Sequence, residues 1–243
     1  MLQLSRITFA AEDPRRLAEF WATLLGYDTD ETDHQVFARG EGPALCFKAM
    51  PKSPTIEVPI HLDINVPDRE AEVRRALEHG ARLVTTRTEE IGKHAETFTI
   101  MRDPEGNGFC IQGPDPRNPR PYVGNVTFSS AEPRKLGAFW SNALDWPEQG
   151  APDGFLDMLL AAGLDRAEFE AYYATMNADG TRPRFLFQRR EKSRPAHYPV
   201  HLDFRADGQD AEVDRLIGLG ASLVERKRWA VLRDPEGNPF CVE

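Results

Sequence analysis

The sequence predicts an α+β protein that consists of two tandem repeats. One block occurs twice, at residues 61–110 and 201–241: a strand that reads His-Leu-Asp, a helix that ends in Gly-Ala, and the run Asp-Pro-Glu-Gly-Asn-x-Phe-Cys. The segments upstream of each block repeat as well. Within each repeat, apolar residues recur with a period of two in some segments and with helical spacing in others, which indicates strands alternating with helices. Repetition on this scale determines the architecture before any residue is given a role.

The first quarter of the chain reads as a strand, a helix and further strands. Polar and apolar residues alternate over residues 4–9, which is the pattern of a strand with one buried face. Asp13 is an N-cap followed by a proline at the first helical position, and an apolar stripe with helical spacing continues until Gly26. Residues 28–43 predict a loose hairpin, and residues 44–48 a further strand.

The second quarter begins with another strand and helix. Residues 59–66 alternate again and place His61 and Asp63 on one face of a strand. Asp68 is positioned to cap a helix that Gly80 stops. Three strands are then expected, at residues 81–84, 98–102 and 109–112. The last two flank Asp-Pro-Glu-Gly-Asn, where proline and glycine suit a tight hairpin turn, so we interpret this motif as structural.

A proline-rich segment separates the two repeats. Residues 114–121 cannot continue a strand or a helix, so we predict a linker there between domains at residues 1–113 and 122–243. Corresponding residues lie 119 positions apart at the start of the repeats and 140 apart at His61 and His201, so the second repeat carries 21 additional residues. The closing turns lie only 131 positions apart, so it then lacks nine.

The insertion in the second repeat, at about residues 150–182, has a helical pattern of its own. The spacing predicts two short helices, and their apolar stripes include Phe155, Met158, Phe169, Tyr172 and Tyr173. Such a stripe is interpreted as extra core, as a lid or as a contact between copies.

Composition limits the class of partner. The 243 residues carry a formal charge of −9, and the arginines are scattered among acidic residues. No nucleic acid and no membrane are therefore expected as partners, because an anionic partner of either kind requires a clustered basic face. Three cysteines suit reduced thiols, and the N-terminal segment lacks the layout of a signal peptide. We therefore expect a cytoplasmic protein.

These features resemble the vicinal oxygen chelate superfamily, which includes glyoxalase I, bleomycin-resistance proteins and extradiol dioxygenases. The resemblance rests on the Pro-started helix with Phe-Trp, on His61 and His201, and on the two Asp-Pro-Glu-Gly-Asn turns. It covers nearly the whole chain apart from the linker and the insertion. It implies two tandem glyoxalase-like domains, each of two βαβββ modules that form a half-barrel around a cavity. The inserted helices would then lie beside the open mouth of the second half-barrel and help to close its cavity.

The resemblance also implies four strand positions at which metal-dependent members carry His, Glu or Gln. These positions hold Arg6, Cys46, His61 and Cys110 in the first repeat, and Asn125, Leu186, His201 and Cys241 in the second. Only the histidines match, and sets drawn across the repeats are no better, so neither a metal nor another cofactor is expected. The alternative is a divalent metal, zinc or iron, on Cys46, His61 and Cys110, because a Cys₂His set suits zinc with a fourth position open. Whether the sites form within or between repeats stays open.

Each strand histidine is followed two residues later by an aspartate on the same face. His61 with Asp63 and His201 with Asp203 are candidate catalytic pairs in which the carboxylate orients the imidazole as a base, and a hydrogen-bonded structural pair is the alternative. Strand alternation places further polar residues on the cavity face. The candidate ligand-binding residues are Arg6, Thr8, Lys48, His61, Gln112, Asn125, Thr127, Tyr172, Tyr173, Gln188, His201 and Arg205.

The predicted function is the binding of a small organic molecule without a family-type metal, as the resemblance to the bleomycin-resistance branch implies. One alternative is a lyase, isomerase or dioxygenase of the superfamily that uses an atypical metal set or His61 and His201 as bases. Another is an interaction module whose cavities are filled by side chains. The molecule is expected to be a monomer with an internal pseudo-two-fold axis or a homodimer.

Overall fold

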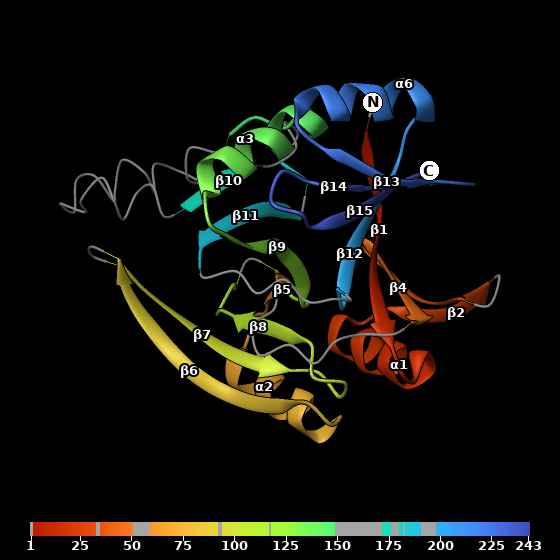
Figure 1. The fold of residues 1–243 in the computed structure, drawn as a ribbon. Helices are drawn as coiled ribbons and strands as arrows, with labels where there is room; N and C mark the ends of the chain where they lie inside the picture. The colour runs from red at the N-terminus through yellow and green to blue at the C-terminus, as the bar shows by residue number, and fades with distance from the viewer. Residues whose placement is uncertain are drawn as a thin grey trace.

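The computed structural model describes residues 2–32, 35–50, 59–91, 94–116, 118–148, 172–175, 180–181, 183–190 and 198–243. These residues form two open β-sheets, and helices lie at the two ends of the molecule with the sheets between them (Figure 1). The predicted α+β class is therefore confirmed. Within this part of the chain, every helix is too short or too polar to cross a membrane. The cytoplasmic location stays a prediction.

The first module follows the predicted order of elements. It consists of β1 (Gln3–Ala11), α1 (Pro14–Leu25), β2 (Asp28–Thr32), β3 (Gln35–Arg39) and β4 (Ala44–Ala49). Asp13 caps α1 by accepting a hydrogen bond from the amide of Arg16. Gly26 ends α1 in the left-handed conformation, which glycine adopts without strain. Within residues 28–43, where a loose hairpin was predicted, β2 and β3 pair as regular antiparallel strands.

The second module contains a longer hairpin than predicted. It consists of β5 (Ile60–Asn65), α2 (Arg69–Glu78), β6 (Arg82–Ile91), β7 (His94–Arg102) and β8 (Gly108–Gln112). The strands predicted at residues 81–84 and 98–102 are too short, because β6 and β7 extend together away from the rest of the sheet (Figure 1). This hairpin is rich in β-branched threonine, and the hydroxyl oxygens of Thr88 and Thr97 lie 2.9 Å apart across it. The prediction missed the outer parts of β6 and β7 because the residues there do not alternate between polar and apolar.

In the described residues, the second repeat follows a similar order of helices and strands, with one strand fewer in its first module. Its first module contains β9 (Tyr122–Ser130), α3 (Pro133–Leu144), β10 (Tyr172–Thr175) and β11 (Arg184–Arg189). Its second module contains β12 (Val200–Arg205), α6 (Gln209–Leu219), β13 (Ser222–Arg226), β14 (Ala230–Arg233) and β15 (Pro239–Val242). The hairpin of β13 and β14 is shorter than that of β6 and β7, which matches the nine residues that the second repeat lacks.

Tyr172 and Tyr173 lie on a strand, which corrects the prediction of a helix for this part of the insertion. β10 pairs antiparallel with β11, where Tyr172 is the partner of Gln188 and Tyr173 the partner of Phe187. Helical spacing of a few aromatic residues does not decide the structure here, because tyrosine and threonine favour strands and the edge of β11 offers unpaired backbone groups. Outside the described residues lie the other members of the predicted stripe, Phe155, Met158 and Phe169.

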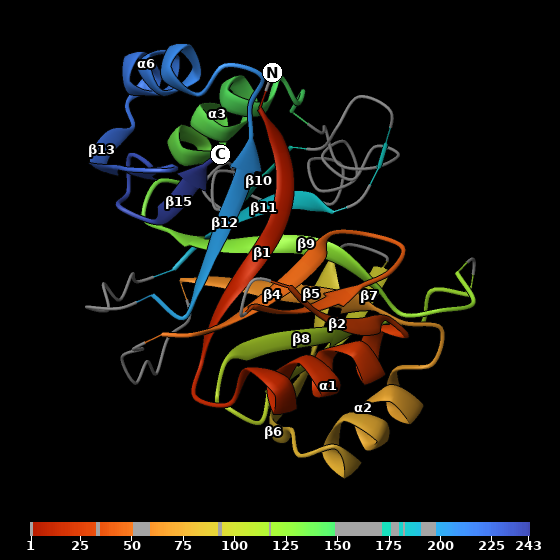
Figure 2. The same ribbon diagram turned by 90° about the vertical axis from the view of Figure 1, so that its right-hand side faces the viewer.

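Each sheet combines one module from each repeat. The eight-stranded sheet has the order β13-β14-β15-β12-β1-β4-β3-β2, and the seven-stranded sheet the order β10-β11-β9-β5-β8-β7-β6. β1 pairs antiparallel with β12, and β5 with β9, so the first module of one repeat joins the second module of the other (Figure 2). Both sheets remain open, as expected for half-barrels. Each sheet is therefore built from strands of both repeats.

Within each repeat, the aromatic residues of one helix connect the two modules. The ring of Trp21 on α1 lies 5.4 Å from that of Phe9 on β1 and 5.2 Å from that of Phe109 on β8. In the second repeat, Trp140 on α3 lies 5.0 Å from Phe240 on β15. Because β1 and β8 belong to different sheets, these buried contacts hold the two sheets together.

The Asp-Pro-Glu-Gly-Asn turn reinforces the same connection, which confirms its structural interpretation. The carboxylate of Asp103 is buried and accepts hydrogen bonds from Asn107 and from the indole nitrogen of Trp21, 3.2 Å away. The carboxylate of Glu105 accepts hydrogen bonds at 2.8 and 2.7 Å from two backbone amides at the start of α1. The second turn repeats these contacts at α3 with Asp234, Glu236, Asn238 and Trp140. Each turn therefore fastens a second module to the helix of the first module in its own repeat.

Candidate functional site

A set of polar side chains projects from one face of the eight-stranded sheet. Thr8 is the register partner of both His201 and Cys46, and Arg6 is the partner of Asp203. Laterally paired residues project from the same face of a sheet, and residues two positions apart on a strand share that face. We call this set site 1, and it consists of Arg6, Thr8, Cys46, Lys48, His201, Asp203, Cys241 and Glu243.

Site 2 is the counterpart on the seven-stranded sheet. It consists of Asn125, Thr127, Leu186, Gln188, His61, Asp63, Cys110 and Gln112. In both sites, the first two strands come from one repeat and the last two from the other. The sites thus form between the repeats, which answers the question that the sequence left open.

Asp203 is the centre of site 1. Its Oδ2 atom accepts hydrogen bonds from Arg6 Nε at 2.8 Å and from Thr8 Oγ1 at 2.6 Å, and its Oδ1 atom lies 3.2 Å from His201 Nε2. The guanidinium of Arg6 also binds the carboxylate of Glu243. Burial would raise the pKa of Asp203, but the hydrogen bond from His201 and the contributions of the other donors outweigh it and hold this pKa below its usual range. Asp203 is therefore an anion at neutral pH.

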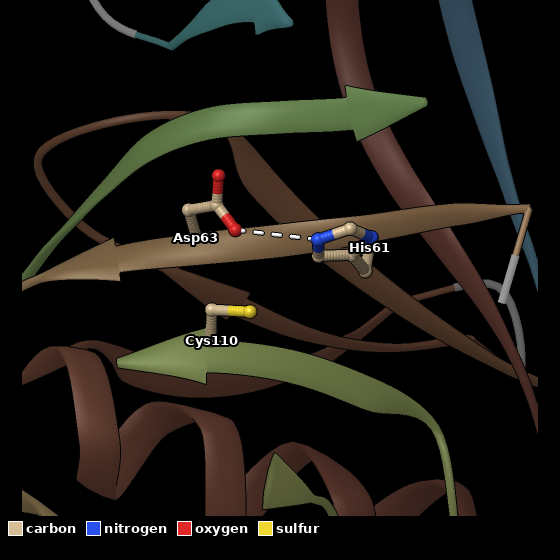
Figure 3. A group of neighbouring side chains, drawn as sticks. All are labelled: His61, Asp63 and Cys110. Atoms are coloured by element: carbon tan, nitrogen blue, oxygen red, sulfur yellow. Dashed lines mark ion pairs between the residues drawn. The ribbon is translucent and has the colours of Figure 1, made fainter. Parts of the chain in front are cut away.

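Asp63 has the same place in site 2. Its Oδ2 atom accepts hydrogen bonds from Asn125 Nδ2 at 2.8 Å and from Thr127 Oγ1 at 2.7 Å, and its Oδ1 atom lies 3.4 Å from His61 Nε2. Figure 3 shows His61 and Asp63 on one strand, with Cys110 beside them on the next. Burial would raise the pKa of Asp63, but the hydrogen bond from His61 and the other donors lower it below the usual value.

The cysteines of site 1 are protonated thiols at neutral pH. Cys46 is buried, and its Sγ donates a hydrogen bond to Gln35 Oε1 at 3.3 Å. Burial raises the pKa of Cys46. Burial and the negative charge of Asp203 raise the pKa of Cys241. Because the thiolate is the nucleophilic form of cysteine, neither residue is activated as a nucleophile.

The residues of site 1 do not fit a divalent metal. His201, Asp203 and Cys241 offer possible ligand atoms that all lie within 4.8 Å of one another. Both oxygens of Asp203 are, however, already engaged by neighbouring donors. Arg6, whose charge is permanent, occupies the first-strand position at which the superfamily resemblance implies a metal ligand. A cation placed here would meet the guanidinium of Arg6, which already binds Asp203.

The residues of site 2 are a poor fit for a metal as well. His61, Asp63 and Cys110 offer possible ligand atoms within 4.8 Å of one another. The carboxylate of Asp63 is again engaged on both oxygens. Asn125 occupies the first-strand position, and its Oδ1 accepts a hydrogen bond from Arg184 Nε at 2.5 Å. The amide oxygen that could serve as a ligand is therefore bound to a cation of the protein.

The structure does not bring together the Cys₂His set on which the sequence placed a zinc alternative. Cys46 lies on β4 of the eight-stranded sheet, whereas His61 and Cys110 lie on β5 and β8 of the seven-stranded sheet. The physical reason is that each module pairs with a module of the other repeat, so the two modules of one repeat lie in different sheets.

Other predicted residues lie in or beside the two sites. Lys48 belongs to site 1, whereas Gln112 and Gln188 belong to site 2. Tyr172 is next to site 2 in register, as the partner of Gln188 on the adjacent strand β10. Arg205, at the end of β12, is exposed and lies two residues beyond Asp203 on the strand of site 1.

Three further residues contribute to the sites without having been predicted: Glu243, Arg184 and Trp229. Strand alternation could have identified Glu243, which lies two residues beyond Cys241. Trp229 lies between β13 and β14, and its ring centroid is 5.8 Å from Nζ of Lys48 on β4. Because β15, β12 and β1 separate β14 from β4 in the sheet, this contact requires the sheet to curl and has no local signal in the sequence.

A family model described as "Glyoxalase-like domain" matches residues 6–112 and 125–243, which together are most of the chain. The chain belongs to the glyoxalase-like domain family. Each match contains one repeat, and the expected resemblance to the vicinal oxygen chelate superfamily is thereby confirmed. No curated protein matches this glyoxalase-like chain.

The glyoxalase-like chain is also similar to solved structures over its full length. Glyoxalase I from Zea mays has 12% sequence identity and a TM-score of 0.64, with 100% of this chain and 92% of that chain covered. A proposed dioxygenase from Bacillus subtilis subsp. subtilis str. 168 has 14% identity and a TM-score of 0.61, with 98% and 84% covered. Identities this low show a shared fold and leave the activity to the residues of the sites.

Proposed function

We propose that this glyoxalase-like protein binds a small organic molecule at site 1, at site 2 or at both, without a catalytic metal. The observation that carries the proposal is the hydrogen bonding of Asp203 and Asp63, whose oxygens are engaged by neighbouring side chains instead of remaining available for a cation. Polar groups that hold one another in place form a preorganised surface, and such surfaces give a small-molecule site its specificity.

In each network, the histidine is more exposed than the aspartate beside it. The side chains of His61 and His201 are each 14% exposed, whereas those of Asp63 and Asp203 are 3% and 2% exposed. A ligand that approaches either face therefore meets an imidazole whose orientation is fixed by a buried carboxylate. The histidine would donate or accept the hydrogen bond that recognises the ligand.

A second candidate function is proton transfer by the same histidines. An imidazole beside a buried carboxylate, at 3.2 Å for His201 and 3.4 Å for His61, is an arrangement that a general base uses. The names of the similar structures, glyoxalase I and a proposed dioxygenase, are names of enzymes. Under this alternative, His201→Gln or His61→Gln would abolish turnover of a bound ligand while leaving most of its affinity.

Elemental analysis and a thermal-shift screen test the proposal. We expect purified protein to carry no stoichiometric transition metal and to keep its melting temperature in a chelator. A panel of anionic, neutral and cationic small molecules should contain members that raise the melting temperature, since a ligand at a hundred times its Kd stabilises the folded state by about 2.7 kcal/mol. His201→Gln or His61→Gln should reduce the stabilisation by a ligand of its own site.

Arg74→Gln is the control, because Arg74 is exposed on α2 and belongs to neither site. It should leave ligand stabilisation unchanged. About one zinc or iron per chain, lost together with thermal stability in Cys110→Ser or Cys241→Ser, would contradict the proposal and favour a metal-dependent enzyme.

A further inference from the structure

Sites 1 and 2 differ in charge at equivalent positions. The first strand carries Arg6 in site 1 and Asn125 in site 2. On the next strand of site 1, Lys48 lies two residues beyond Cys46. On the next strand of site 2, Gln188 lies two residues beyond Leu186. Site 1 thus contains two cations where site 2 contains two amides, and it contains the anion Glu243 where site 2 contains Gln112. The two sites should therefore select ligands of different charge.

The positive charge of Arg6 is already used within the protein. Its guanidinium binds the carboxylates of Asp203 and Glu243. Burial would lower the pKa of Arg6, but the charges of these two carboxylates outweigh it and raise this pKa. A ligand anion would have to displace an internal carboxylate to reach Arg6, so Arg6 is a poor anchor.

Lys48 is the cation of site 1 that remains available. It is half-buried at its position on β4, and it forms no ion pair with any carboxylate of the described residues. Its interaction on this face is the contact with the ring of Trp229. An ammonium without a counter-ion among the described residues favours an anionic ligand, because a charge-assisted hydrogen bond to it is stronger than one between neutral groups.

Trp229 places an apolar surface next to this ammonium. It reaches Lys48 from the far edge of the curled sheet, and the residue is 37% exposed. An indole ring beside a cation suits a ligand that combines an anionic group with an apolar or planar body. A single ammonium, with Asp203 and Glu243 on the same face, suits one negative charge better than two.

We propose that site 1 binds a small monocarboxylate, with its carboxylate on Nζ of Lys48 and its apolar body against Trp229. This inference rests on the proposed function and names the ligand class for one of the two sites. Site 2, which has Gln188 in place of Lys48, does not take this ligand.

Binding of matched acids and amides tests the inference. The probes are acetate, butyrate, benzoate and phenylacetate, each compared with its primary amide by calorimetry and by intrinsic tryptophan fluorescence. We expect the acids with an apolar body to bind with a fluorescence change and the amides to bind at least about tenfold more weakly. Lys48→Gln, which introduces the residue of site 2, should weaken the acids by a similar factor and leave the amides unaffected. Trp229→Leu should remove the fluorescence change and weaken benzoate more than acetate.

Gln188→Ala is the matched control at the equivalent position of site 2 and should leave acid binding unchanged. Equal affinity for acids and amides, or acid binding that survives in Lys48→Gln, would overturn the carboxylate assignment. So would a failure of all four acids at millimolar concentration. If neutral or cationic molecules of the thermal-shift screen still bound and lost affinity in His201→Gln or His61→Gln, the proposed function would stand without this assignment. If nothing in either experiment bound, both would fail.

Discussion

Sites 1 and 2 share a framework but differ in the charges around it. In each site, a buried aspartate accepts a hydrogen bond from a threonine and lies beside its own histidine. A guanidinium then binds the aspartate in site 1, where site 2 has the amide of Asn125. The aspartate, the threonine and the histidine are common to both sites. The first-strand position beside them differs in charge.

The hydrogen bonds of this framework join strands of different repeats. Asp203 belongs to the second repeat, and its donors Arg6 and Thr8 belong to the first. Asp63 belongs to the first repeat, and its donors Asn125 and Thr127 belong to the second. Each hydrogen-bonded aspartate therefore crosses the junction between β12 and β1 or between β5 and β9. Changes at these residues should alter the free energy of unfolding, and the size of the change should differ between site 1 and site 2.

The largest expected effect is the loss of the carboxylate in site 1. Asp203→Asn leaves the half-buried guanidinium of Arg6 with only one of its two anions, so we expect the free energy of unfolding to fall by about 3–5 kcal/mol. Asp63→Asn leaves neutral donors without a charged acceptor and should cost about 1–3 kcal/mol. Urea unfolding followed by circular dichroism measures both. Equal losses would show that Arg6 gives site 1 no special dependence on its carboxylate.

The next effect comes from converting the charges of site 1 into those of site 2. Arg6→Asn removes the cation that binds two carboxylates, and it should cost about 2–3 kcal/mol of unfolding free energy. Glu243→Gln introduces the residue that site 2 has at the equivalent position, Gln112. Added to Arg6→Asn, it removes one of the two carboxylates that have lost their cation. The double variant should therefore be more stable than Arg6→Asn alone. A double-mutant cycle measures this coupling, and strict additivity would contradict the charge network.

The change of unfolding free energy with pH should be smaller than these effects, and its direction follows from the pKa of Asp203. The folded-state pKa of Asp203 is lowered, so its contribution is present above the unfolded value of about 3.9 and is lost as the pH falls through the folded value. The stability advantage of the natural protein over Asp203→Asn should therefore shrink as the pH falls below about 4. Unfolding curves at a series of pH values measure it, and a constant advantage would contradict the lowered pKa.

Asp103 provides a control of opposite sign. Burial raises the folded-state pKa of Asp103 more than its hydrogen bonds lower it. Its contribution is fully present below the unfolded value and is lost as the pH rises through the folded one. The advantage of the natural protein over Asp103→Asn should thus grow as the pH falls, in the same set of unfolding curves.

The smallest expected change in stability is that of Lys48→Gln. Lys48 forms no ion pair with any carboxylate in the described part of the chain, and its contact with the exposed ring of Trp229 is worth about 0.5–1 kcal/mol. We expect a loss no larger than this in urea unfolding, although the same variant should have the largest effect on carboxylate binding. A loss of several kcal/mol would show that Lys48 has a structural role instead.

Several positions of the candidate sites were predictable because strand alternation is a local property. His61 and Asp63 lie on one face of β5, as the period of two requires, and their equivalents in the second repeat lie alike. Alternation fails where the pairing partner decides the structure. Tyr172 lies on β10 because the edge of β11 is available, and no spacing within the insertion shows that edge.

The sequence by itself determined the repeat, the order of strands and helices, the structural turn and the pairing of each strand histidine with an aspartate. These features depend on residues close to one another in the chain, where periodicity and turn chemistry act directly. Only the tertiary structure decided that β1 joins β12 and that Asp203 therefore meets Arg6 and Thr8. The two repeats have nearly the same strands, so local patterns allow either pairing, and the contact of Trp229 with Lys48 exists only because a sheet of distant segments curls.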